Sequence, residues 1–223
     1  MKSKMIIDET SQEKIPYEFY YWGPFLWKTT VAPELIKFLL KESKPLKESF
    51  SKKLAGDLSQ QMLYSKQSHK RVWDKLRIYI DEYFKAFQKE WNCTPGIKWN
   101  PLNVWINYQR AQDHNPYHKH AGDFSFVIYC SIPKILKEEI KEVAERTNHP
   151  SPGGISFFYG DPQMHMGIGE HYFVPEEGTL FMFPAYLRHM VYPFRSKCTR
   201  ISVSGNFEVR NDEYEQVIKH NYD

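Results

Sequence analysis

Three histidines stand where strand residues could direct them toward one point. His118 and His120, in the stretch NPYHKHAGDFSFVIY (115–129), lie two residues apart, and side chains at i and i+2 of a strand point to the same face of a sheet. His189 follows a strongly apolar stretch and a Pro-Ala-Tyr turn, a position from which a side chain can face into the mouth of a barrel. Neutral imidazole is a common ligand of transition metals. These three residues therefore form a candidate metal site.

A candidate anion site follows eleven residues after His189. In the stretch RISVSGNF, Arg200 and Ser202 share one face of the expected strand. An inward-facing arginine is costly to bury unless an anion meets it. The sequence thus places an anion-binding pair close to the candidate metal ligands.

The elements that must position these residues are mostly short strands. Apolar alternation bounded by turn residues predicts strands at 103–109, 123–132, 153–160, 171–176, 178–184, 189–194 and 200–209. So many short strands in succession indicate a sandwich or a barrel. Before them, residues 20–31 resemble a strand, and apolar residues at steps of three and four predict helices over 32–43 and 69–91. The charged stretch 134–154 is predicted to be a solvated insertion, helical as far as Arg146.

The aromatic stripe of the helix at 69–91 is interpreted as core that packs against a sheet. The chain of 223 residues is long enough for one sizeable domain. We expect residues 1–98 to supply a strand and supporting helices, 99–210 to form the β-rich core, and 211–223 to be a tail.

Charge and cysteine usage exclude several classes of protein. A net charge of +3, with lysines spread over many short segments, gives no clear indication of nucleic-acid binding. Cys93, Cys130 and Cys198 are odd in number and lack short spacings, so neither a disulfide framework nor a thiolate zinc site is expected. No apolar run is long enough for a signal peptide or a membrane span. We therefore expect a soluble, cytoplasmic protein without a membrane partner.

Taken in order along the chain, these stretches resemble those of the 2-oxoglutarate and iron(II)-dependent oxygenases. Within this family they resemble the small prolyl-hydroxylase-like branch found in phage and bacterial genomes. The resemblance runs from about Asn103 to Phe207. Its elements are INYQ, the H-x-H pair, SFVIY, GTLFMFP, HMVYPF and R-x-S. It implies a mainly β protein with supporting helices, built on a double-stranded β-helix, the cupin-like jelly-roll of two packed sheets.

The resemblance implies a 2-oxoglutarate and iron(II)-dependent dioxygenase that hydroxylates a substrate, a peptidyl side chain being one candidate. Iron(II) is the cofactor implied, 2-oxoglutarate the co-substrate, and O₂ the oxidant. Three protein ligands would hold the iron on one face. The residues implied as ligands are His118, His120 and His189.

The resemblance also implies contacts to the co-substrate. Arg200 would form a bidentate pair with the distal carboxylate of 2-oxoglutarate, and Ser202 would donate to the same carboxylate. Tyr108 lies ten residues before His118, as a cofactor-contacting tyrosine does in prolyl-hydroxylase relatives, and Tyr129 ends the SFVIY strand. Both tyrosines are expected in the same pocket.

The chain departs from the family pattern at the second ligand, where most members have Asp or Glu and this sequence has His120. Three arrangements are open: three histidines bind the iron; Asp123 supplies the carboxylate; or the pair is shifted, with His120 as first ligand and a gap at Gly122. The first is preferred because Asp123 would lie on the opposite face of a regular strand. Three neutral imidazoles would leave the site one charge more positive.

Two other functions fit the same residues. One is a three-histidine dioxygenase of the cupin kind that needs no 2-oxoglutarate, in which Arg200 would recognise a substrate carboxylate. The other is a non-catalytic binding module that keeps a metal for structure, in which a further side chain would fill the metal's coordination shell.

Overall fold

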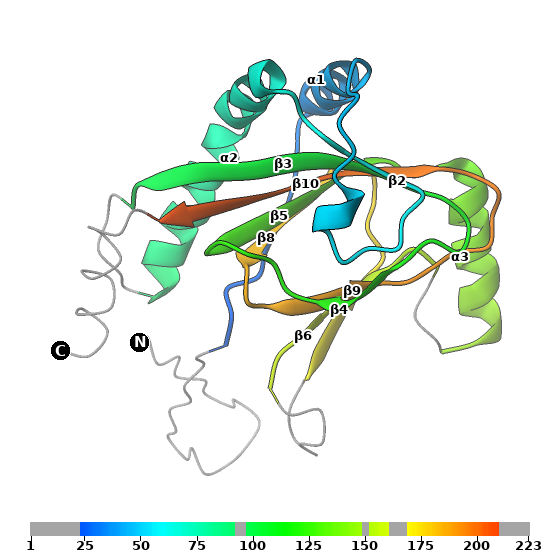
Figure 1. The fold of residues 1–223 in the computed structure, drawn as a ribbon. Coiled ribbons are helices and arrows are strands. Elements are labelled where there is room, and N and C mark those ends of the chain that lie inside the picture. Colours follow the sequence, from blue (N-terminus) through cyan, green and yellow to red (C-terminus); the bar gives the residue numbers. More distant parts are fainter. Residues whose placement is uncertain (1–22, 92–96, 149–151, 161–168, 210–223) are drawn as a thin grey trace, which may run out of the picture.

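Two antiparallel sheets make up most of the computed structural model, which describes residues 23–91, 97–148, 152–160 and 169–209 (Figure 1). The major sheet has the strand order β1-β8-β5-β10-β3-β2. Its strands are β1 (Trp27–Thr30), β2 (Gln60–Leu63), β3 (Trp99–Gln109), β5 (Phe124–Ser131), β8 (Thr179–Pro184) and β10 (Arg200–Val209). The minor sheet has the order β4-β9-β6-β7. Its strands are β4 (Asn115–His118), β6 (Ile155–Phe158), β7 (Glu170–Phe173) and β9 (Arg188–Val191).

The major sheet separates an apolar layer from a layer that contains the candidate site, because strand residues alternate between its faces. On β10, Val203 belongs to the larger apolar core, whereas Ser202 and Ser204 line a cavity on the opposite face. A smaller apolar core lies between the sheets and includes Phe181 of β8 and Phe157 of β6, whose rings are 5.5 Å apart. The sheets thus pack face to face, as in a jelly-roll.

Helices α1 (Pro33–Ser43) and α2 (Lys66–Trp91) cover the outer face of the major sheet (Figure 1). Apolar residues of α2 at steps of three and four are buried, and the Trp73 ring meets Phe126 of β5 edge to face at 5.6 Å. The prediction that this stripe is core is confirmed. Leu76 and Ile80 are fully buried, so the helix is held mainly by packing against the sheet.

Helix α3 (Lys134–Arg146) packs on the smaller core, so the prediction of a solvated insertion is wrong for one of its faces. Leu136 is 1% exposed and Val143 is 8% exposed. The carboxylate of Glu139 accepts hydrogen bonds from the backbone N–H groups of Arg195 (2.9 Å) and Ser196 (2.7 Å). A single aliphatic stripe between many charges is enough to dock this helix.

Other predicted elements differ mainly at their ends. Of the strand expected at 20–31, only Trp27–Thr30 is a strand in the described residues. The helix expected from residue 69 begins at Lys66. The short 3-10 helix η1 (Ser51–Lys53) and strand β2 were not predicted. The expected tail, 211–223, lies outside the described residues. None of the helices in the described part of the chain is both long and apolar enough to span a membrane.

Candidate active site

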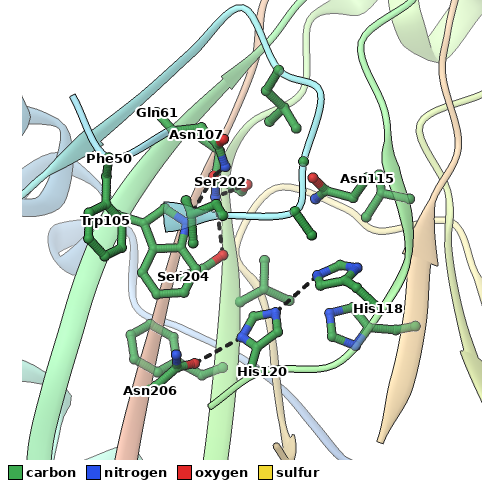
Figure 2. Close-up of a pocket in the computed structure, with 18 of the residues that line it drawn as sticks. Phe50, Gln61, Trp105, Asn107, Asn115, His118, His120, Ser202, Ser204 and Asn206 are labelled. Atoms are coloured by element: carbon green, nitrogen blue, oxygen red, sulfur yellow. Dashed lines mark hydrogen bonds between the residues drawn. The ribbon is translucent and has the colours of Figure 1, made fainter. Parts of the chain in front are cut away.

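A cavity of about 440 Å³ opens between the two sheets, close to the ends of β4 and β10. Its walls come from β2, β3, β5, β8 and β10 of the major sheet, from β4, β6 and β9 of the minor sheet, and from the segment 50–58 (Figure 2). The three candidate metal ligands and the candidate anion pair all line it. One cavity therefore contains both predicted sites.

His118, His120 and His189 converge on one point of this cavity. His118 of β4 and His189 of β9 are paired across the antiparallel strands, and their ring centroids are 4.3 Å apart. His120 lies beyond the end of β4, where its N–H donates to the carbonyl of Ala185 (2.9 Å). One ring nitrogen from each histidine lies within 4.8 Å of the others. His120 follows the last residue of β4 by two positions, and its ring stacks beside that of His118 with centroids 5.1 Å apart.

The hydrogen bonds of these rings fix the nitrogen that is free to bind a metal. The Nδ1 atoms of His118 and His189 lie 2.6 Å and 3.0 Å from the carbonyls of Pro116 and Leu187, which can only accept, so both Nδ1 atoms carry the proton. Each Nε2 atom then presents a lone pair to the cavity.

His120 is oriented in the same way, by side chains of the major sheet. Its Nδ1 lies 2.9 Å from Oδ1 of Asn206 (Figure 2). The same atom lies 2.7 Å from Oγ of Ser125. With the proton on Nδ1, its Nε2 faces Nε2 of His118 at 3.2 Å. Two lone pairs at this distance repel each other, and a divalent cation between them removes the repulsion. The three histidines therefore fit iron(II), a metal that accepts imidazole ligands.

Burial favours the neutral form of all three rings. Loss of solvation lowers the pKa of His118, lowers the pKa of His120 to about 4, and lowers the pKa of His189 well below its usual value. The proximity of the other rings lowers the pKa of His189 further, since two nearby imidazolium charges repel. Neutral imidazoles are the form that coordinates a metal.

Arg200, the first residue of β10, also lines the cavity. It is 3% exposed, and one Nη donates to the carbonyl of Gly153 at 2.5 Å. Its guanidinium lies 5.0 Å from the ring centroid of Tyr129, a cation–π arrangement. No carboxylate of the described residues pairs with it, and its Nε has no hydrogen-bond partner. Ser202 lies two residues further along β10, on the same side.

Tyr129 is fully buried beside this arginine, and its hydroxyl hydrogen has no acceptor among the described residues. Burial raises its pKa, although the charge of Arg200 lowers it, so the hydroxyl keeps its proton and can donate. An unpaired guanidinium N–H, a free hydroxyl and the hydroxyl of Ser202 on one cavity wall match the acceptor oxygens of a carboxylate. This group of residues fits the distal carboxylate of 2-oxoglutarate.

The side-chain amides of Asn107 and Gln61 also line the cavity, and their orientation follows from the indole group of Trp105 (Figure 2). The Trp105 Nε1–H, which can only donate, is 3.0 Å from Oδ1 of Asn107, so that atom is an acceptor. Asn107 Nδ2 then donates to the hydroxyls of Ser202 (3.3 Å) and Ser204 (3.1 Å). Gln61 Nε2 donates to the same Oδ1 at 2.9 Å. Gln61 Oε1 is left as a buried acceptor without a partner.

The segment 50–58 closes one side of the cavity and is fixed to the rest of the molecule. Two backbone hydrogen bonds join Asp57 and His114, at 3.0 Å and 3.1 Å. Gly56 lies against the side chain of Asn115, and a Cβ at this glycine would come within 2.0 Å of the Asn115 Oδ1. A larger residue would displace the ends of the Asn115 and Leu58 side chains, so this wall is positioned by direct contact with the edge of β4.

Two predicted site residues lie away from the cavity. Tyr108 points to the other face of β3, where its hydroxyl donates to Oγ of Ser43 and its ring packs on the larger core. The prediction of a co-substrate contact is therefore wrong for this tyrosine. Asp123 accepts a hydrogen bond from the N–H of Val209 (2.8 Å) and is not grouped with the histidines. Gly122, the gap in the shifted arrangement, lies against Leu102, outside the cavity.

Several cavity residues were missed by the sequence reasoning. Asn206 continues the series 200, 202, 204 on one face of β10, so strand alternation alone could have identified it. In the same way, Trp105 and Asn107 share one face of β3, and Tyr108 lies on the other face. Gln61 gave no signal, because the stretch around it shows neither helical nor strand periodicity.

Comparisons with known proteins agree with this description. Residues 103–206 match a family model described as "Putative 2OG-Fe(II) oxygenase". A search of curated proteins gave no significant match. Among solved structures, a prolyl-4-hydroxylase from Pseudomonas putida is similar over 83% of this chain and 93% of its own, with 14% identity and a TM-score of 0.51.

Two further structures are similar to the same extent. An oxidoreductase of the 2OG-Fe(II) oxygenase family from Burkholderia pseudomallei has 17% identity and a TM-score of 0.50, covering 79% of this chain and 78% of its own. HygX from Streptomyces hygroscopicus, solved with nickel and 2-oxoglutarate bound, has 8% identity and a TM-score of 0.50, covering 82% of both chains.

The two packed sheets with a histidine cluster at one end are the double-stranded β-helix of an oxygenase, as predicted. The part of the chain from residue 103 to residue 206 belongs to the 2-oxoglutarate and iron(II)-dependent oxygenase family. The protein is an enzyme of this class, with iron(II) as cofactor and 2-oxoglutarate and O₂ as co-substrates.

Proposed function

We propose that His118, His120 and His189 hold the iron(II) of this oxygenase through their Nε2 atoms. The observation that carries this proposal is the convergence of three ring nitrogens whose partner Nδ1 atoms are all engaged with neutral oxygens. Such outer hydrogen bonds fix the tautomer and the ring orientation of a ligating histidine. Asp123 is excluded from this proposal, because its carboxylate is held by the backbone of Val209.

Arg200, Ser202 and Tyr129 bind the distal carboxylate of 2-oxoglutarate. Arg200 is held ready by Gly153 and by the ring of Tyr129, so little side-chain freedom is lost when the anion arrives. The bound iron would supply the remaining contact to the co-substrate and the activation of O₂. The ring of Phe183 and the side chain of Ile155 also line the cavity and exclude water around the bound co-substrate.

Hydroxylation of a substrate C–H bond is the reaction we propose. The structural-metal alternative needs a further ligating side chain, and among the described residues no Asp, Glu or Cys joins the histidine cluster. We also propose that the segments 1–98 and 99–210 form one domain, since β1 and β2 belong to the same sheet as β10. The cysteine spacing supports a cytoplasmic location, and the small net charge supports a substrate other than nucleic acid.

The direct test is anaerobic addition of iron(II) and then 2-oxoglutarate to the purified protein. A weak visible charge-transfer band is expected when the co-substrate chelates the metal. His189→Ala should lose tight iron(II) binding, and Arg200→Met should keep the metal but weaken 2-oxoglutarate by about 30-fold or more, as expected for a lost charge-assisted pair. Arg200→Lys should restore little, because lysine lacks the planar fork.

The choice of the third ligand is tested by a matched pair of variants. His120→Ala should lose much of the iron(II) affinity, whereas His120→Asp should retain it. Asp123→Ala, three residues away, is the control and should bind iron(II) as the wild type does. The reverse order, with Asp123→Ala stripping the metal and His120→Ala tolerated, would contradict the three-histidine site.

A further inference from the structure

Among the described residues, cationic side chains line the cavity and no acidic one does. Of the described residues that line it, Arg200, Lys53 and Lys119 are cationic, and none is an aspartate or a glutamate. Arg200 is buried without a carboxylate partner among the described residues, whereas the two lysines are exposed. Asp123, the acid closest in sequence to His120, is held by a backbone N–H outside the cavity. The residues that the structure describes therefore offer no anion to this site.

The charges do not balance when metal and co-substrate are bound as proposed. A histidine that ligates through Nε2 and keeps its proton on Nδ1 is neutral, so the three ligands contribute no charge. The divalent ion brings two positive charges and Arg200 brings one, whereas 2-oxoglutarate brings two negative charges. One positive charge remains, and a carboxylate in place of His120 would have cancelled it.

An uncompensated charge in a partly dehydrated cavity is costly until a counter-charge binds. Lys53 and Lys119 add to the positive potential, because clefts lined by charge of one sign concentrate oppositely charged ligands. We propose that the cavity takes a third anionic group, a carboxylate or phosphate carried by the substrate, which binds beside the metal and within reach of these lysines. This inference rests on the proposed function and names the substrate class.

The test uses the cobalt(II)-loaded protein with saturating 2-oxoglutarate under anaerobic conditions. Cobalt(II) provides a visible spectrum that reports metal binding, co-substrate binding and any further ligand, without turnover. Acetate, methyl phosphate and azide are the anionic probes, and acetamide is the uncharged match of acetate. We expect acetate and methyl phosphate to bind saturably and acetamide to bind at least about tenfold more weakly.

Two variants restore the missing negative charge by different routes. His120→Asp places it on the metal, and Asn206→Asp places it behind His120, at the atom that accepts the Nδ1 proton. Each should weaken acetate binding by about fivefold to 100-fold. The second variant keeps the inference falsifiable if the first disturbs the metal. Lys53→Gln and Lys119→Gln should weaken acetate and methyl phosphate severalfold, and Lys52→Gln, an exposed neighbour that does not line the cavity, should not.

The results of these titrations separate the proposed substrate class from its alternatives. Equal binding of acetate and acetamide, or acetate affinity unchanged within about twofold in both charge variants, overturns the inference. Response to azide alone, without acetate or methyl phosphate, assigns the charge to a small inorganic anion and overturns the substrate class. If cobalt(II) binds but 2-oxoglutarate leaves its spectrum unchanged, the proposed function fails first, and the inference falls with it.

Discussion

The metal-free protein should lose stability in mild acid because of the buried imidazole of His120. Its pKa is lowered from 6.5 to about 4 in the folded protein, chiefly by loss of solvation. The unfolded chain therefore binds a proton at a higher pH than the folded chain does. The contribution to stability is fully present above pH 6.5 and is lost progressively as the pH falls toward 4.

The size of the effect follows from the two pKa values. Between pH 7.5 and pH 5.0, proton binding to the unfolded state lowers the free energy of unfolding by about 2 kcal/mol through this one residue. For a chain of this length, that corresponds to a fall in Tm of about 4 to 8 °C. His118 and His189 have lowered pKa values as well and act in the same direction.

The assay is thermal unfolding of chelator-treated protein at the two pH values. His120→Gln should remove about 2 kcal/mol of the pH-dependent change, and His171→Gln, which alters an exposed histidine of β7, should leave it unchanged. Equal pH-dependent changes in Tm for the wild type and for His120→Gln would refute the reasoning. Such a result would mean that the ring is solvated, or already charged, in the folded protein.

Three further predictions concern residues around the two subsites. Asn206→Leu removes the acceptor of the His120 Nδ1–H and should weaken the binding of cobalt(II) by about 10-fold to 100-fold in a competition titration. An unchanged Kd for cobalt(II) would mean that Ser125 alone orients this ring. Gln61→Met should leave the Kd for 2-oxoglutarate within about twofold of the wild-type value, because the ionised co-substrate has no hydrogen to donate to the free Oε1. A large loss of 2-oxoglutarate affinity would place Gln61 in the co-substrate pocket. Gly153→Ala should destabilise the fold by about 1 to 2 kcal/mol, because φ at this residue is 68°, a conformation that alanine disfavours. A Cβ there would meet only ordinary van der Waals contacts, so backbone strain is the expected cause, and an unaltered Tm would contradict it.

Strand alternation predicted the end of the site that is built on a regular strand. Arg200 and Ser202 share the cavity face of β10, because this strand is unbroken over the residues concerned. The place of Tyr108 was taken instead from the family resemblance, as ten residues before His118, and this count crosses a turn. In that turn Gln112 has a φ of 69°, and the pairing of β4 with β9 shifts its register before His118. A shift of one residue reverses the face of every side chain, so the count could not cross this turn.

The wall formed by the segment 50–58 could not be predicted, because long-range contacts hold it in place. Its bridge joins Asp57 to His114, residues far apart in the sequence, and β2 obtains its pairing from β3. Neither contact leaves a periodic pattern in the sequence. The helices α1 and α2, in contrast, bury one face against the sheet and were predicted from that pattern.

A site built only from imidazole nitrogens binds competing metals with unequal strength. For a given set of nitrogen ligands, affinity rises from iron(II) through cobalt and nickel to copper, and zinc also exceeds iron. Oxygen ligands suit harder ions better, so replacing a carboxylate with His120 removes one feature that favours iron over its competitors. If the three histidines hold the metal as proposed, iron would occupy the site only where free copper and zinc are scarce. The enzyme overproduced in medium rich in zinc should collect zinc at these three histidines and be inactive until it is stripped and reloaded.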